Sequence, residues 1–82
     1  MRTRKQALGN RNIIGASVEK ARKNQGMKQK ELLAHMQTKG IDLNSSALSK
    51  LEGQVRGVWD FELSALADVL NVSVNWLLGR EK

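Results

Sequence analysis

The chain has 82 residues, contains neither cysteine nor proline, and has 14 Lys and Arg residues against 8 Asp and Glu residues, a net charge of +6. This length holds one small domain without a large active-site cleft, and the lack of cysteine excludes disulfides and thiolate metal sites in this chain. No apolar run approaches the roughly 20 residues needed to cross a bilayer, and no apolar signal segment follows Arg11 and Asn12, so we expect a cytoplasmic protein.

The N-terminal segment, residues 1–10, is polar and basic, and we expect it to form a mobile arm. Residues 1–30 contain nine Lys and Arg residues against Glu19 alone, a net charge of +8, whereas the remaining residues carry −2. Such a surface attracts polyanions, although a charge run can also be only a solubilising face, and both interpretations stay open. Lys20 and Lys23 are the weakest contact candidates because they suit the outer face of a helix.

The next two expected elements are amphipathic helices that end at glycines. The first runs to about Asn24 and stops before Gly26, and the second runs from about Lys28 to Lys39, with Gly40 in the left-handed position that ends a helix. Apolar residues recur along one face of each helix at the 3.6-residue period. These residues are Ile14, Val18 and Ala21 in the first helix and Leu32, Leu33 and Met36 in the second.

Three more helices complete the expected all-α fold. A third helix spans Ser45–Glu52, with Asn44 as its N-cap. Asp60 is expected to be the N-cap of a fourth helix, and Ser73 the N-cap of a short fifth helix. Trp59 and Trp76 are expected to have packing roles in the core or at its edge.

Short motifs follow one another in a fixed order between Ile13 and Gly79. They are Arg22, Gly26-Met27-Lys28-Gln29, Glu31-Leu32, Leu48, Leu51-Glu52-Gly53, Leu66-Ala67 and the run from Leu70 to Gly79. Together they resemble the lambdoid repressor and Cro class of helix-turn-helix DNA-binding domains, the XRE family. The resemblance implies a compact five-helix, lambda-repressor-like domain in residues 11–79, a basic arm in residues 1–10 and a tail in residues 80–82.

The resemblance also implies a function and the residues that perform it. The protein would be a sequence-specific transcriptional regulator, expected to repress, which binds double-stranded DNA as a homodimer with the third helix in the major groove. Arg22 and Glu52 would form a structural ion pair. The implied DNA contacts are base edges for Ser45, Ser46, Ser49 and Lys50 and phosphates for Gln29 and Arg56. From its basic composition, the arm is also expected to contact DNA, through Arg2, Arg4 and Lys5.

The third helix and the segment before it set limits on this interpretation. The connection between the second and third helices is about five residues longer than the usual tight turn, most of which a longer second helix ending at Gly40 would absorb. The exposed face of the third helix has no Arg, Gln or Asn for a bidentate base contact, so specificity is expected to depend on DNA shape and on the arm. The alternative, that the three serines are only solvated, stays open.

Other classes of function have less support in the sequence. His35 is the only histidine, the serines lack a partnered base, and there is no glycine-rich phosphate loop, so we expect neither an enzyme nor a metal or cofactor. The alternative is a protein-interaction module that keeps the fold and has lost base readout. The expected partners are duplex DNA and a second copy, with no membrane, and a protein antirepressor is left unspecified.

Overall fold

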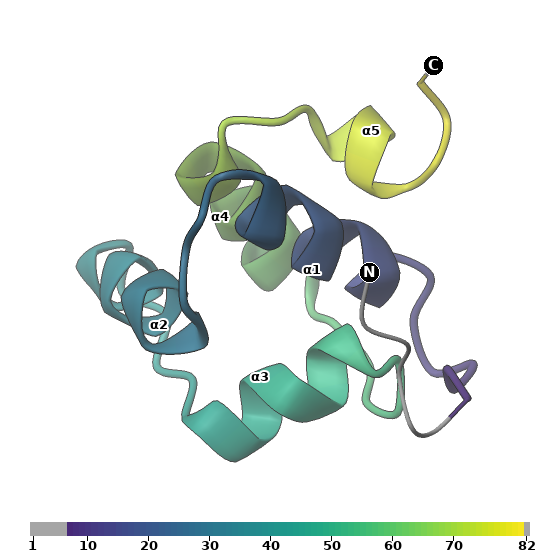
Figure 1. The fold of residues 1–82 in the computed structure, drawn as a ribbon, viewed down its shortest axis with the longest axis horizontal. Coiled ribbons are helices and arrows are strands. Elements are labelled where there is room, and N and C mark those ends of the chain that lie inside the picture. Colours follow the sequence, from purple (N-terminus) through teal and green to yellow (C-terminus); the bar gives the residue numbers. More distant parts are fainter. Residues whose placement is uncertain (1–6, 82) are drawn as a thin grey trace.

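The computed structural model describes residues 7–81, and these residues form five helices without a strand (Figure 1). The all-α, five-helix class expected from the sequence is therefore confirmed. None of the helices in this part of the chain is long and apolar enough to cross a membrane. In chain order the helices are α1 (Gly15–Asn24), α2 (Gln29–Thr38), α3 (Ser45–Glu52), α4 (Asp60–Leu70) and α5 (Val74–Leu77).

Most helix ends follow local sequence signals. The Asn44 side chain accepts a hydrogen bond from the Ala47 N–H at 2.7 Å and caps α3, as predicted. The Ser73 hydroxyl likewise accepts from the Trp76 N–H at 2.9 Å and caps α5. Gly40 follows α2 with φ of +79°, a left-handed conformation that glycine adopts without a steric penalty. Asn44 and Ser73 therefore mark the starts of their helices, and Gly40 marks the end of α2, as the sequence indicates.

The start of α4 differs from the prediction. Its N-cap is Trp59, and Asp60 is the first helical residue. The helix starts one residue earlier than predicted, and the Glu62 carboxylate reaches back to accept the Trp59 N–H at 3.0 Å. Trp59 also does not lie in the core: the residue is 65% exposed, and its ring stacks on the exposed Phe61 ring at the surface. Trp76, by contrast, is half-buried and packs against the core.

All five helices contribute side chains to one core. Each helix has a single apolar stripe, so none can bury its stripe without the others. Full burial of one such side chain contributes about 1.5–3 kcal/mol relative to exposure. The buried apolar residues are Ile14, Val18, Ala21, Leu32, Met36, Leu48, Leu51, Ala65, Leu66, Ala67, Leu70 and Leu77.

Helices α1 and α3 pack at very short range. A Cβ atom at Gly15 would lie 2.2 Å from the carbonyl oxygen of Leu51, so glycine is needed for this approach. In Figure 1, α3 lies along the lower edge of the domain below α1, and α2 packs beside it. The outer side of α3 therefore faces away from the core.

The segment before α1 is attached to the loop that follows α3. The Gly9 N–H donates to the Gly53 carbonyl and the Arg11 N–H donates to the Gln54 carbonyl, both at 2.9 Å. The predicted mobile arm, which extended to residue 10, is therefore wrong for Gly9. The sequence offered no local sign of this docking, because the contacts join residues more than 40 positions apart.

Candidate nucleic-acid interface

The outer face of α3 is polar and exposed. Its inner face carries Leu48 and Leu51, which are fully buried. At 3.6 residues per turn, Ser46 and Lys50 lie opposite these leucines, Ser49 lies at the side, and Ser45 is the first residue of the helix. These four polar residues are the predicted base contacts, and all of them are exposed.

Glu52 attaches the end of α3 to α1. Its carboxylate accepts hydrogen bonds from Arg22 Nε at 2.7 Å and from Arg22 Nη2 at 3.0 Å, so the two side chains meet in bidentate geometry as expected. The Glu52 side chain is 1% exposed and that of Arg22 is 8% exposed. The remaining terminal nitrogen of Arg22 donates to the Met27 carbonyl at 2.8 Å, which also fixes the turn before α2. Both buried charges are thus paired, which a buried ion pair requires.

Gln29, the first residue of α2, extends this network to the outer face of α3. Its Nε2 donates to Glu52 Oε1 at 2.9 Å, and its Oε1 accepts a longer hydrogen bond from the Ser49 hydroxyl at 3.4 Å. Gln29 was predicted to contact phosphate; its side chain is half-buried and one Nε2 N–H is used within the protein, which leaves the second N–H for such a contact. Gln29 thus links the start of α2 to two residues of α3.

Arg56, the other predicted phosphate contact, lies in the loop between α3 and α4 and faces Glu62. The two terminal guanidinium nitrogens lie 3.4 and 3.3 Å from the carboxylate oxygens, and the Arg56 side chain is 24% exposed. Sequence reasoning missed this pair, since a spacing of six residues across a loop follows no helical period. A phosphate would have to use the remaining N–H groups of the guanidinium.

The predicted contacts in the arm, Arg2, Arg4 and Lys5, lie outside the described residues. The long connection between α2 and α3 is anchored: Ile41 and Leu43 are half-buried and pack against the core. The connection therefore forms a packed loop, and α2 ends at Thr38, two residues before Gly40.

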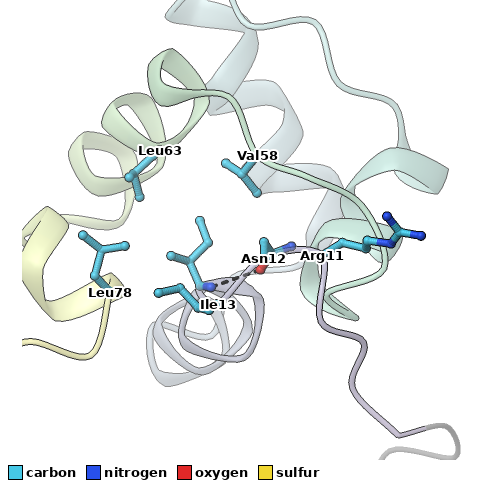
Figure 2. Close-up of a pocket in the computed structure, with 7 residues that line it drawn as sticks. Arg11, Asn12, Ile13, Val58, Leu63 and Leu78 are labelled. Atoms are coloured by element: carbon cyan, nitrogen blue, oxygen red, sulfur yellow. Dashed lines mark hydrogen bonds between the residues drawn. The ribbon is translucent and has the colours of Figure 1, made fainter.

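A second surface feature contains no residue from α3. It is an open hollow of about 210 Å³ formed by segments next to α1, α4 and α5 (Figure 2). The Arg11 side chain points away from the other labelled side chains, so the lining is mainly apolar. Its apolar lining residues are Ile13, Ile14, Val58, Leu63 and Leu78.

The chemistry offered by the outer face of α3 is hydrogen bonding and one positive charge. Serine hydroxyls both donate and accept, whereas the Lys50 ammonium only donates. Within residues 7–81, no group of three or more His, Cys, Asp or Glu residues could hold a metal ion. Comparisons with models of protein families, with curated proteins and with solved structures gave no match for this chain.

Proposed function

We propose that the protein is a duplex-DNA-binding transcriptional regulator, a cytoplasmic repressor that places α3 in the major groove. The observation that carries this proposal is the two-sided environment of α3. Its inner side is fixed by Leu48, Leu51 and the buried Glu52, while its outer side exposes hydrogen-bonding groups. The major groove of B-DNA, about 12 Å wide, admits one α-helix, and its base edges present matching donors and acceptors.

The residues of this surface have different proposed roles. Lys50 donates to the O6 and N7 acceptors of guanine, and the serines contact base edges of several types. Gln29 contacts a phosphate at the start of α2, and its hydrogen bonds to Ser49 and Glu52 connect that contact to α3. Arg56 and the basic N-terminal segment contact phosphates, which strengthens binding to every sequence.

The distribution of charge supports a polyanionic partner. The net charge of +8 over residues 1–30 contrasts with −2 over the rest of the chain. In the described part, Lys28 and Lys30 are exposed and flank Gln29, which bonds to Ser49 on the outer face of α3. Phosphate contacts by such residues release counterions, so binding should weaken steeply with salt.

Titration of a fluorescent duplex at 50 and 200 mM salt tests the proposal. We expect binding to any duplex at low salt, with affinity falling by at least tenfold at the higher salt as phosphate contacts are screened. Selection from a random duplex library should then return one preferred site, and Lys50→Ala should reduce that preference. No binding at low salt would refute the proposed function.

A protein-interaction module is the second candidate. The apolar hollow and the exposed Trp59 and Phe61 rings favour it, because exposed apolar surface often marks a protein contact. Such a module would have no reason to bind duplex DNA at low salt and to release it at high salt. The salt titration therefore separates the two candidates.

We also propose that the regulator binds as a homodimer on a two-fold site. One domain places only α3 in the major groove, and a second copy would place its own α3 one helical turn away. Val74 in α5 is 37% exposed, and Leu78 directly after α5 lines the hollow. These two side chains are accessible from outside the core, and we propose that they form the interface between the two copies.

A further inference from the structure

We propose that Gln54 is a positioning residue. It acts as a clamp that holds the chain before α1 against the end of α3 and so determines the point from which the basic segment, residues 1–8, extends toward DNA. The inference rests on the proposed function and adds the way in which the N-terminal chain is directed to its DNA contact.

Gln54 lies in the loop after α3 and bonds to three positions in and before α1. Its Nε2 donates to the Gly9 carbonyl at 3.2 Å, and its Oε1 accepts from the Ala16 N–H at 3.1 Å. Its own carbonyl accepts from the Arg11 N–H at 2.9 Å. The side chain and the backbone of one residue thus hold a stretch of eight residues, from 9 to 16.

The backbone of Gln54 is itself unusual. Its φ is +61°, a left-handed conformation that glycine adopts far more readily than glutamine. Glycine at this position would end α3 equally well but would lack the amide group. The side-chain contacts to Gly9 and Ala16 are therefore what the glutamine adds to the loop.

Two further residues complete the clamp. Asn12 Nδ2 donates to the carbonyls of Leu51 and Arg56 at 3.1 and 2.8 Å, so it joins the last turn of α3 to the loop that follows it. A Cβ atom at Gly9 would lie 2.3 Å from the Gln54 carbonyl oxygen, and the chain can pass this close only with glycine. The Gly9 N–H bond to the Gly53 carbonyl then fixes the exit of the chain at the C-terminal end of α3.

This exit point matters for a chain that binds DNA. Eight residues span at most about 27 Å when extended. The centre of the neighbouring minor groove lies about half a helical turn, roughly 17 Å, along the axis from the major groove. Residues 1–8 can therefore reach that groove from the end of α3, and they carry Arg2, Arg4 and Lys5, the residue types attracted to its negative potential. Fixing the start of the segment raises its effective concentration there.

A double-mutant cycle tests this coupling. The DNA affinity of the wild type is compared with that of Gln54→Gly, of a deletion of residues 2–8, and of the two changes combined. Gln54→Gly keeps the left-handed turn and removes only the amide contacts. We expect it to weaken binding to the preferred site by about threefold to tenfold in the full chain, as the effective concentration falls, and to have no further effect after the deletion.

A second pair of variants approaches the clamp from its other side. Gly9→Ala places a methyl group against the Gln54 carbonyl, while Gly57→Ala makes the same chemical change where no atom lies within 4 Å of the new Cβ. Gly9→Ala should weaken DNA binding as Gln54→Gly does, and Gly57→Ala should not. Thermal melting without DNA shows whether each variant is folded. Hydrogen exchange at the amides of residues 9 and 16, which bond to the Gly53 carbonyl and the Gln54 side chain, shows whether the clamp is open.

The outcomes distinguish this inference from the proposed function. Equal losses from Gln54→Gly with and without residues 2–8 would show that the clamp does not act through the N-terminal chain and would overturn the inference alone. An open clamp with unchanged DNA affinity would overturn it as well. A wild-type protein that binds no duplex at low salt would overturn the proposed function and this inference with it.

Discussion

Replacing Glu52 with alanine should destabilise the whole domain. The substitution removes the acceptor for Nε and Nη2 of Arg22 and for Nε2 of Gln29, at a site where the carboxylate is 1% exposed. The Arg22 guanidinium would stay buried with its charge uncompensated. Breaking a buried pair in this way costs on the order of 3 kcal/mol. For a domain of this size, 1 kcal/mol shifts the melting temperature by about 4–8 °C, so we expect a decrease of about 12–24 °C.

Thermal unfolding followed by circular dichroism measures this effect, and the chain offers a matched control. Lys23, the residue after Arg22 in α1, forms an ion pair with Glu19 at 3.5 Å, but the Lys23 side chain is 57% exposed. Lys23→Ala should therefore change the free energy of unfolding by no more than about 0.5 kcal/mol. If Glu52→Ala lowers the melting temperature no more than Lys23→Ala does, the reasoning about the buried pair is wrong.

Three further predictions concern DNA binding. Lys50→Ala should lose about 1–3 kcal/mol on the preferred site and less on a scrambled duplex, and equal losses on both would reject base readout by Lys50. Arg56→Ala should weaken binding to all sequences and reduce the slope of log affinity against log salt concentration by about one unit, measured by titration at several salt concentrations. A melting curve of this variant would detect any loss of stability from the missing contact with Glu62. Sedimentation with a duplex carrying two half-sites should give two proteins per duplex, and Val74→Glu should reduce this to one; one wild-type protein per duplex at saturation would reject the homodimer.

The parts of the fold that were predictable depend on interactions between near neighbours in the sequence. Asn44 and Ser73 bond to an amide three residues ahead, and Gly40 ends its helix through its own backbone freedom. The apolar periodicity likewise showed which face of each helix is buried. The Arg22 and Glu52 pair, 30 residues apart, came from the family resemblance and not from spacing.

What the sequence did not reveal depends on contacts between distant residues or on competition between neighbours. Gly9 and Gln54 are 45 residues apart, and no pattern in the sequence marks that approach. Asp60 is a residue type that often caps a helix, yet the helix begins one residue earlier, where Glu62 accepts the Trp59 N–H. The phosphate role predicted for Gln29 considered only its place at a helix start and missed its hydrogen bonds to Glu52 and Ser49.

The separation between the two sides of α3 bears on how such a protein could change during evolution. The residues that hold the helix, Leu48, Leu51 and Glu52, differ from those that it exposes. Substitutions at exposed helical positions usually change stability by less than about 0.5 kcal/mol, whereas core substitutions commonly cost several kcal/mol. New side chains at Ser45, Ser46 or Lys50 could thus be sampled one at a time without loss of the fold. Ser49 is more constrained, because any replacement must accommodate Gln29.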